Sequence, residues 1–223
     1  MLQVAEKYRK QDFWSAENLK YAQPHFRLEK VARIVNRMAR GRDCDLLDVG
    51  CGPATLMRLL QKNVHYYGID IAIHEPAPNL IQADFLETPI KFRDRKFDII
   101  VAQGVFEYIG KFQADKFSDI SQLLKKDGTF VASYVNFNHL NRLIYAPYNN
   151  VQLFDEFRKN LSRFFRIDKI IPTSHHWNHH EPNRKLAKAI QMHVNVSIPV
   201  ISRLLAIEYF FICSPRGARD PQT

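Results

Sequence analysis

Apolar and polar positions along the chain change in blocks that predict strands and helices in turn. The apolar run at residues 44–49 ends in a turn that contains Gly50 and Gly52, and apolar residues then return at helical spacing up to Leu60. This order is typical of a buried strand, a tight turn and a helix. Further runs of strand type occupy residues 65–72, 80–85, 97–102 and 129–135. Strands that alternate with helices predict an α/β fold in which right-handed crossovers join parallel strands.

A second long helix and a less regular second half complete this prediction. Residues 105–124 are predicted as a helix that a basic last turn and Gly128 close. The later segments are a helix at 151–165, a strand at 166–172, a helix-rich insertion at 182–206 and a final strand at 208–213. An antiparallel edge strand near the C-terminus would give a mixed sheet.

The segment before the first strand is polar and aromatic at first and then carries apolar residues at helical spacing. Its aromatic side chains, Trp14 and Tyr21 among them, either pack on the domain or close over a ligand. The predicted organisation is an N-terminal helical cover segment at 1–40, one domain at 41–217 with a helical insertion at about 178–206, and a flexible tail at 218–223.

The charge of the chain bears on its partners. The 32 Lys and Arg residues exceed the 23 Asp and Glu residues, which gives a net charge of +9. Such a charge steers anionic partners, including nucleic acid, phosphorylated small molecules and acidic lipid surfaces. The net charge alone does not distinguish among these classes of partner. A hydrophobic fraction of 46% and a charged fraction of 25% are ordinary for a soluble globular domain.

The cysteines and the apolar stretches indicate the compartment. Cys44, Cys51 and Cys213 are three in number, and an odd count favours a reducing environment over a disulfide framework. No apolar core follows a basic start at the N-terminus, so no secretory signal is predicted. The apolar stretch at 194–213 is interrupted by charged residues and a proline, which argues against a transmembrane helix. We therefore expect a cytoplasmic protein.

Polar side chains follow four successive predicted strands. Ligands in an open α/β sheet bind outside the carboxyl ends of the strands, so residues at these ends are candidate ligand contacts. Asp70 follows Gly50 by 20 residues, a spacing at which a carboxylate can accept hydrogen bonds from ribose hydroxyls. The candidates are Asp48, Gly50 and Gly52 at the first strand end, Asp70 at the second, Asp84 at the third and Gln103 at the fourth.

A dinucleotide site is the first alternative, because glycine turns followed by an acid also bind NAD. Here Thr55 stands where the G-x-G-x-x-G pattern has its third glycine, and Asp48 lies directly before the turn. A side chain at position 55 would crowd the helix where a pyrophosphate needs close approach of the backbone. A carboxylate beside the turn is better suited to a ligand that carries positive charge and no phosphates.

The turn also resembles a family motif. Asp48-Val49-Gly50-Cys51-Gly52-Pro53-Ala54 is similar to the first motif of class I S-adenosylmethionine-dependent methyltransferases, and Asp70, Ala83-Asp84 and the segments 97–109 and 124–128 follow in the order of the later motifs. The resemblance spans about residues 45–135 and, more loosely, the last two strands. It implies a Rossmann-like fold: a mostly parallel seven-stranded sheet with an antiparallel C-terminal edge strand and helices on both faces.

The resemblance implies S-adenosyl-L-methionine as the cofactor and gives roles to residues of the first turn. Gly50 and Gly52 would let the backbone approach the methionyl portion of the cofactor. Asp48 would support that loop and the amino group of the ligand. Ala54 stands where the family pattern often has a further glycine, and alanine is tolerated there if the backbone is helical.

The later strand ends receive roles in the same way. Asp70 would hold the ribose, Asp84 would face the adenine amine, and Gln103 would lie by the sulfonium. Phe85, directly after Asp84, belongs to the same cofactor-binding set. For each acid the alternative is a carboxylate that only caps a turn or is solvated.

Methyl transfer mainly requires that the acceptor be held at attack distance, and a base is needed only when the acceptor must lose a proton. His139, after the fifth strand, is the candidate base, and its alternative is a loop histidine bonded to the backbone. Tyr108 and the neighbouring Glu107 either orient the acceptor or only begin a helix. His176 is placed to face the active site from a strand end.

Four histidines between residues 175 and 180 suggest a metal site at first sight. No nearby cysteine pair or H-E-x-x-H pattern completes a ligand set. We therefore predict no metal there and interpret the cluster as a surface loop or an acceptor-site loop.

The acceptor is predicted by elimination. The fourth strand ends in Gln103-Gly104-Val105-Phe106, which differs from the Asn/Asp-Pro-Pro-aromatic arrangement of enzymes that methylate base amines, and no RNA-binding module is evident. We expect a small-molecule or saccharide acceptor, with oxygen as the acceptor atom. An RNA methyltransferase and a non-catalytic S-adenosylmethionine-binding protein are the alternatives, and a homodimer is compatible with the sequence. Basic side chains would favour an anionic acceptor: Arg142, Arg158, Lys159, Arg163, Arg166, Arg184, Lys185 and Lys188.

Overall fold

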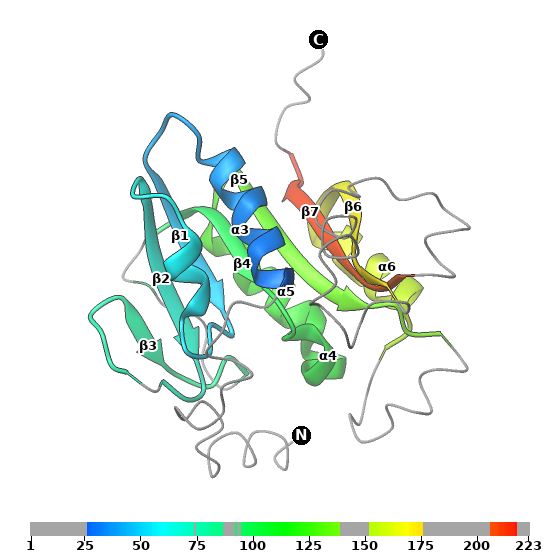
Figure 1. The fold of residues 1–223 in the computed structure, drawn as a ribbon. Helices are drawn as coiled ribbons and strands as arrows, with labels where there is room; N and C mark the ends of the chain where they lie inside the picture. The colour runs from blue at the N-terminus through cyan, green and yellow to red at the C-terminus, as the bar shows by residue number, and fades with distance from the viewer. Residues whose placement is uncertain are drawn as a thin grey trace.

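The computed structural model describes residues 26–73, 75–86, 92, 95–138, 152–175 and 206–217 of the chain. A single mixed sheet of seven strands, in the order β3-β2-β1-β4-β5-β7-β6, forms the centre of the fold (Figure 1). Its strands are β1 (Cys44–Val49), β2 (Val64–Asp70), β3 (Leu80–Gln82), β4 (Phe97–Ala102), β5 (Leu124–Val135), β6 (Phe165–His175) and β7 (Ala206–Pro215). Strands β1 to β5 pair in parallel, and β7 runs antiparallel to both β5 and β6. The predicted class I methyltransferase fold is confirmed.

Apolar residues on both sides of the central strands explain why helices cover both faces. In β1, Leu46 belongs to the apolar cluster of one face and Leu47 to that of the other, and both are fully buried. Ile99 and Ile100 of β4 divide between the two faces in the same way. A parallel strand buried on both faces has to be apolar at consecutive positions, which is the pattern of these segments.

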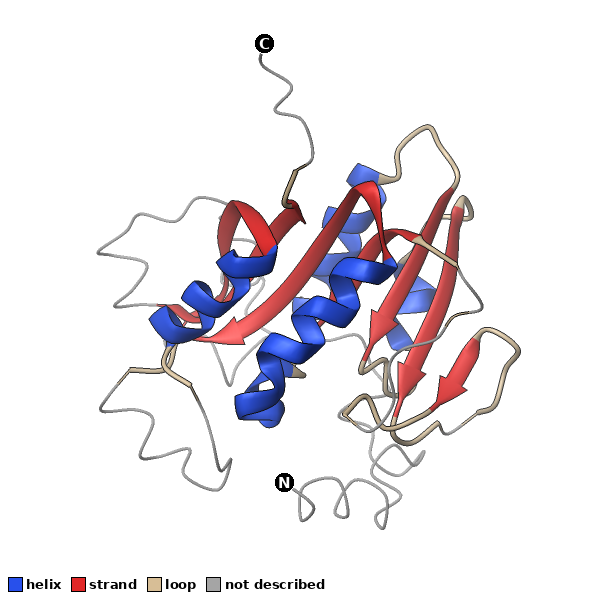
Figure 2. Ribbon diagram, turned by 180° about the vertical axis from the view of Figure 1, so that it is seen from behind, coloured by secondary structure: helices blue, strands red, loops and turns tan. Residues whose placement is uncertain are grey.

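The helices are α3 (Phe26–Met38) and the 3₁₀ turn η1 (Thr55–Leu59) on one face, and α4 (Phe106–Ile109), η2 (Gly110–Phe112), α5 (Gln113–Leu123) and α6 (Phe154–Phe164) on the other (Figures 1 and 2). Helix α3 buries Val31 and Val35 against the first face. Figure 2 shows α5 and α6 crossing the opposite face of the sheet. The part of the cover segment that the structure describes is thus helical and packed, as predicted.

Two predicted helices differ from the structure. The segment at 56–60 is a short 3₁₀ turn, η1, rather than an α-helix. The helix expected at 105–124 is divided at Gly110, whose positive φ of 47° breaks the helix between α4 and α5. Its predicted last turn instead belongs to β5, because Leu124 pairs with Phe97 five residues before the predicted start of that strand at 129.

The antiparallel C-terminal strand is confirmed, but its predicted position at the edge is not. Strand β7 lies between β5 and β6, and β6 is the edge strand. Burial accounts for this order: Phe210 and Phe211 of β7 are both fully buried, one in the apolar cluster of each face. Arg166 and Lys169 of β6 are exposed, and charged side chains are typical of edge strands.

Some predictions fall on residues outside the described part of the chain. These are the first 25 residues of the cover segment, nearly all of the insertion at 178–206, and the tail at 218–223. The domain boundaries therefore remain predictions. Among the described residues, no helix combines the length and hydrophobicity that crossing a membrane requires.

Aromatic side chains fill the core between the sheet and α4, α5 and α6. Phe117 of α5 is fully buried, stacks on Phe106 with ring centroids 4.7 Å apart, and meets Phe157 at 5.6 Å. Tyr134 of β5 stacks on Phe157 with centroids 3.9 Å apart. Phe117 therefore lies where α4, α5 and α6 meet.

Phe117→Ala is expected to lower the free energy of unfolding by about 3–5 kcal/mol, because it removes a fully buried ring and leaves a cavity. Phe112→Ala, at a partly buried site one turn away, is the matched control and should cost less. Urea unfolding monitored by circular dichroism measures both. Equal losses for the two variants would contradict the role given to Phe117.

Candidate functional site

The order of the strands places a crevice beside β1. The chain leaves β1 toward β2 and β3 and then returns to β4 on the other side of β1. Ligands of open α/β sheets bind at this switch of direction, outside the carboxyl ends of the strands. The turn after β1 and Gln103 after β4 both lie there. The structure therefore brings the predicted candidates of these two strands to one point.

The glycine turn after β1 is tightly held and leaves no space for a side chain at position 50. Gly50 and Cys51 donate backbone hydrogen bonds to the Ile69 carbonyl at the end of β2, at 2.8 and 3.2 Å. The φ of Gly50 is +74°, and a Cβ at this position would overlap the Cγ2 atom of Val105. Gly50 is therefore required both for its backbone conformation and for the approach of the turn to the end of β4.

Ala54 has a left-handed backbone, with φ 53° and ψ 30°. The condition under which alanine was expected to be tolerated, a helical backbone, is therefore not met. A left-handed alanine costs roughly 1–2 kcal/mol. The buried Cβ of Ala54 packs in the apolar cluster of the α3 face, a contact that glycine would lack.

Asp70 braces the turn from the end of β2. Its Oδ2 accepts the Gly52 N–H at 2.8 Å, and its Oδ1 accepts the Ala72 N–H at 3.0 Å. A carboxylate oxygen has capacity for more than one hydrogen bond, so Asp70 can hold the turn and still accept bonds from the hydroxyls of a ribose. The structure shows that Asp70 supports the turn, and its contact with a ribose remains a prediction.

Asp48 is a buried acid next to the turn, with only 5% of its surface exposed. The Tyr66 hydroxyl donates a hydrogen bond to its Oδ2 at 2.8 Å. Burial raises the pKa of Asp48 to about 7, the hydrogen bond from Tyr66 opposes this rise, and the charge of Asp70 adds to it. A cationic ligand group near Asp48 would favour its ionised form.

Asp84 and Phe85 follow β3, beside the end of β2. The Ala83 N–H bonds to the Asp70 carbonyl at 2.9 Å, so the two strand ends are adjacent. Asp84 accepts the Leu86 N–H at 2.8 Å, which closes a local turn. The ring of Phe85 packs edge to face against Phe106 in the core, with centroids 6.4 Å apart. Direct contact of Asp84 or Phe85 with a cofactor remains a prediction.

Gln103 presents a buried amide oxygen at the end of β4. Within the part of the chain that the structure describes, Oε1 of Gln103 has no hydrogen-bond partner. Buried polar atoms are normally paired, so an unpaired one in a ligand crevice indicates a position that a ligand would satisfy. The predicted role of Gln103 beside the sulfonium remains a prediction.

Glu208 and its partner Arg27 were not identified from the sequence as residues of the site. Glu208 of β7 is 1% exposed, and its Oε2 accepts hydrogen bonds from Arg27 at 3.0 Å and from Thr173 at 3.1 Å. Burial acts to raise the pKa of Glu208, but the charge and hydrogen bond of Arg27 outweigh it and hold this pKa below its usual value. A lone acid in the apolar run at 208–213 was the available signal.

Glu107, which the sequence placed beside Tyr108 as an orienting residue, is also buried. Its Oε1 accepts the Val135 N–H at 3.2 Å, and its Oε2 has no partner among the described residues. Burial, with the charge of Glu208 added, raises the pKa of Glu107 to about 8. Tyr108 is partly buried on the same short helix. The predicted catalytic residues His139 and His176 lie outside the described residues and remain predictions.

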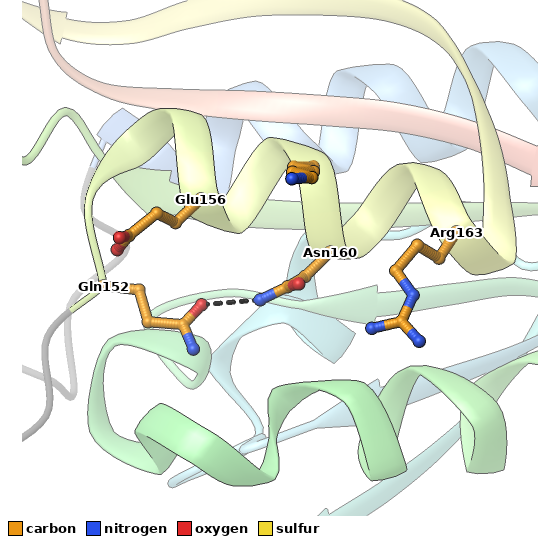
Figure 3. A pocket seen from close by; sticks show the side chains of 5 residues that line it. Gln152, Glu156, Asn160 and Arg163 are labelled. Carbon is orange, nitrogen blue, oxygen red and sulfur yellow. Dashed lines mark hydrogen bonds between the residues drawn. The ribbon is translucent and has the colours of Figure 1, made fainter.

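Two hollows formed by described residues are lined mainly by α6 and β6 rather than by the glycine turn or the acids at the strand ends. One, of about 520 Å³, is lined by Gln152, Glu156, Lys159, Asn160 and Arg163 on the flank of α6 (Figure 3). The other, of about 700 Å³, has Arg158, Arg166 and Lys169 in its lining. The basic residues expected to favour an anionic acceptor are therefore on the outer surface of α6 and β6, as far as they are described.

The possible metal ligands in the described part of the chain are His, Cys, Asp and Glu side chains. No group of three or more His, Cys, Asp or Glu side chains suited to a metal ion occurs in the described ranges. The histidine cluster lies almost entirely beyond them. Cys44, Cys51 and Cys213 are buried and not joined in disulfides.

Together, the seven-stranded order, the glycine turn and the acids at successive strand ends define the class I S-adenosylmethionine-dependent methyltransferase fold. A family model described as a methyltransferase domain matches residues 24–189. The chain belongs to this methyltransferase domain family. The methyl donor of the family is S-adenosyl-L-methionine.

Individual relatives are distant. The malonyl-[acyl-carrier protein] O-methyltransferase of Calditerrivibrio nitroreducens is 27% identical over 146 residues, which cover 62% of this chain and 58% of that protein. The chain thus matches somewhat over half the length of this relative. A TehB-like S-adenosylmethionine-dependent methyltransferase from Corynebacterium glutamicum has a TM-score of 0.61 at 15% identity, over 97% of this chain and 100% of the other. One from Archaeoglobus fulgidus has a TM-score of 0.61 at 17% identity, over 89% and 99%.

The residues at the crevice fit this cofactor. S-adenosylmethionine carries a sulfonium and an amino group, and the crevice offers the Asp48 and Asp70 carboxyls together with the unpaired Gln103 oxygen. Acceptor oxygens and negative charge are suited to a cationic ligand. Two buried acids, Asp48 and Asp70, flank the turn, and their negative charge would disfavour the phosphates of a dinucleotide there.

Gly50→Ala is expected to weaken S-adenosylmethionine binding at least tenfold and to lower the free energy of unfolding by more than Gly41→Ala. Gly41 has a similar φ of +78°, but no atom lies within 4 Å of a Cβ built there. Both variants carry the cost of a left-handed alanine, roughly 1–2 kcal/mol, and only Gly50→Ala adds the overlap with Val105. Calorimetric titration and urea unfolding measure the two effects.

Adding Val105→Ala to Gly50→Ala removes the overlapping methyl group and should restore part of the stability. If the double variant were no more stable than Gly50→Ala, the clash would not be the cause of the loss.

Asp48→Asn is expected to make the protein more stable at pH 8 than the wild type, by roughly 1–4 kcal/mol. The pKa of Asp48 rises from 3.8 in the unfolded chain to about 7 in the folded protein, so between these pH values the folded state holds a proton that the unfolded state lacks. Wild-type stability therefore falls as pH rises through this window. Asparagine keeps the oxygen that accepts from Tyr66 and carries no charge.

Urea unfolding at pH 5 and pH 8 tests this expectation, with Asp43→Asn as the control because the Asp43 side chain is 83% exposed. The gain should be larger at pH 8 and accompanied by weaker cofactor binding. A gain that does not depend on pH would show that burial of charge at Asp48 is not responsible.

Proposed function

We propose that the chain is an S-adenosylmethionine-dependent methyltransferase that acts on a small-molecule acceptor, with oxygen as the acceptor atom. One observation carries the proposal: Asp70 binds the glycine turn through the Gly52 N–H and its own strand end through the Ala72 N–H, at the point where a nucleoside would lie. Family membership supports a methyl donor as the occupant of this crevice.

Each residue of the crevice has a part in holding the donor. The glycine turn presents its backbone to the methionyl portion, Asp48 faces the amino group, and Asp70 receives the ribose hydroxyls. Gln103 supplies an oxygen toward the sulfonium. The bound donor provides an activated methyl group, and the protein fixes the position of the acceptor, since an oriented pair of reactants reacts far faster than a free pair.

Oxygen as acceptor atom is supported by the relative from Calditerrivibrio nitroreducens, which is named as an O-methyltransferase. A small molecule is favoured over RNA because the described basic side chains of α6 and β6 line hollows that include none of the donor-binding residues. A saccharide is one small-molecule acceptor that carries suitable hydroxyl groups.

Asp70→Ala is expected to weaken S-adenosylmethionine binding roughly 10–100-fold, because it removes charged hydrogen bonds both to the ribose and to the turn. Calorimetric titration measures the affinity. Asp43→Ala, which changes a side chain that is 83% exposed, should bind like the wild type. If Asp70→Ala bound S-adenosylmethionine with unchanged affinity, Asp70 would not bind the ribose.

Activity is tested with the wild-type protein, methyl-labelled S-adenosylmethionine and cell extracts. Label in small molecules supports the proposed function, and label in RNA supports the rival substrate class. Tight binding of the donor without any transfer would indicate a binding protein instead of an enzyme.

A further inference from the structure

The strand ends at the crevice form two halves, one on each side of the switch of direction between β1 and β4. All donor-binding residues except Gln103 belong to β1, β2 and the segment after β3, on one side of the switch of direction, and Gln103 at the end of β4 borders both sides. The ends of β4 and β5 and the start of the antiparallel β7 lie on the other side, and Val135 and Glu208 are paired in register there. If the donor occupies the first half, as the proposed function requires, an acceptor must approach from the second.

This second half holds an unusual set of buried oxygen atoms. Glu107 Oε2, Glu208 Oε1 and Gln103 Oε1 have no partner at hydrogen-bond geometry within the described residues, although the Ser133 hydroxyl lies near enough to Glu208 to help lower its pKa. Glu107 is 6% exposed and Glu208 is 1% exposed. Since buried polar atoms of native proteins are nearly always paired, three unpaired oxygens near one end of the sheet indicate that a ligand supplies the missing partners.

The other oxygen of each carboxyl group has a fixed role. Glu107 Oε1 accepts the Val135 N–H, and Glu208 Oε2 accepts from Arg27 and Thr173. These contacts anchor both side chains from β5, α3 and β6, so the unpaired oxygens are held by rigid elements. A site for an acceptor needs this kind of fixed support.

We propose that Glu107 and Glu208, together with Gln103, form the acceptor subsite and select a hydroxyl group over a carboxylate, with Glu107 as the group that receives the hydroxyl proton. The inference rests on the proposed function, because it presumes the methyl donor in the neighbouring half of the crevice. Hydroxyl groups can donate hydrogen bonds to all three oxygens. A carboxylate has no proton to donate and would be repelled by Glu208, whose compensating cation, Arg27, is already in its ion pair.

The ionisation of Glu107 and Glu208 is consistent with a hydroxyl group as the acceptor. Glu208 is ionised and paired with Arg27, while the pKa of Glu107 is raised to about 8 by burial and by the charge of Glu208. Arg27 opposes that rise, and Tyr134 and Tyr108 are the other titratable groups close to the cluster. A carboxyl group with a pKa near the working pH is suited to accept a proton during the reaction.

The methyl transfer requires only these residues and the two substrates. The acceptor oxygen forms a bond to the methyl carbon as its proton moves to Glu107 Oε2. The electron pair of the broken carbon–sulfur bond remains on sulfur, which leaves as a neutral thioether. Glu107 ends the step protonated and returns its proton to solvent when the product leaves.

The acceptor class can be tested before the acceptor is identified. The wild-type protein is incubated with methyl-labelled S-adenosylmethionine, a small-molecule extract, and a defined set of alcohols, sugars and carboxylic acids. A methyl ester made from a carboxylate releases labelled methanol in mild alkali, whereas a methyl ether withstands alkali and releases labelled methyl iodide with hydriodic acid. Label that behaves as a methyl ether is the expected result.

The other results separate this inference from the proposed function. Label released by alkali, or label that resists both treatments as an N-methyl group does, overturns the hydroxyl assignment and leaves the methyltransferase activity in place. Binding of the donor without any transfer overturns both.

The role of Glu107 is tested with Glu107→Gln, which keeps an oxygen for the Val135 N–H. Its turnover number should fall roughly 100-fold or more, with S-adenosylmethionine affinity unchanged. The wild-type rate should rise with pH toward a half-maximum near 8, and the variant should lose this rise. Glu107→Asp should recover part of the rate because it retains a titrating carboxyl.

Glu156→Gln is the matched control. The Glu156 carboxylate also accepts a backbone N–H, that of Leu153 at 2.8 Å, but lies on the outer flank of α6 (Figure 3). This variant should keep the wild-type rate and pH profile. A titration of ¹³C-labelled glutamate side chains by NMR gives a readout without turnover: one carboxyl should titrate near pH 8 and be absent from Glu107→Gln. A pH-independent wild-type rate, or the same profile in Glu107→Gln, would overturn the proton-accepting role.

Discussion

The turn after β1 meets the end of β4 only because residue 50 carries no side chain. A Cβ there would overlap Val105, directly before the helix that carries Glu107. The backbone N–H groups of Gly50 and Cys51 bind the end of β2, and Asp70 binds the turn in return. Three strand ends are thereby held together, and the polar groups of the crevice take their positions from this contact.

Buried carboxyl groups lie on both sides of that contact. Asp48 lies on the donor side, with its pKa raised to about 7, and Glu107 lies on the acceptor side, with its pKa raised to about 8. Burying an acid in this way destabilises the folded state wherever the acid must ionise. Strongly shifted acids are common at functional sites, where binding or chemistry compensates for the loss. Arg27 and Lys30 lie about one turn apart on α3. They bond to Glu208 and to the Pro172 carbonyl, and so attach α3 to β7 and β6.

The sequence was sufficient for features that depend on local pattern. The apolar runs at β1 and β4 could be recognised because a strand buried on both faces has no polar positions. Acids and amides at the strand ends were identifiable for a related reason, since the chain becomes polar where it leaves the sheet. The helix division at Gly110 was missed because the flanking residues suit either a continuous or a broken helix. Phe85 was predicted to bind the cofactor together with Asp84; its ring packs on Phe106, a contact between distant segments that the sequence did not reveal.

The sequence by itself determined the α/β class, the glycine turn and the set of candidate acids, because each follows from residue type and spacing within one segment. Only the tertiary structure decided that β7 lies between β5 and β6, that Asp70 bonds to the turn, and that Glu107 and Glu208 are buried near each other with Arg27 beside them. Arg27 and Glu208 are separated by 181 residues along the chain. Contacts of this kind depend on the packing of distant elements, and burial then sets the charge of each acid.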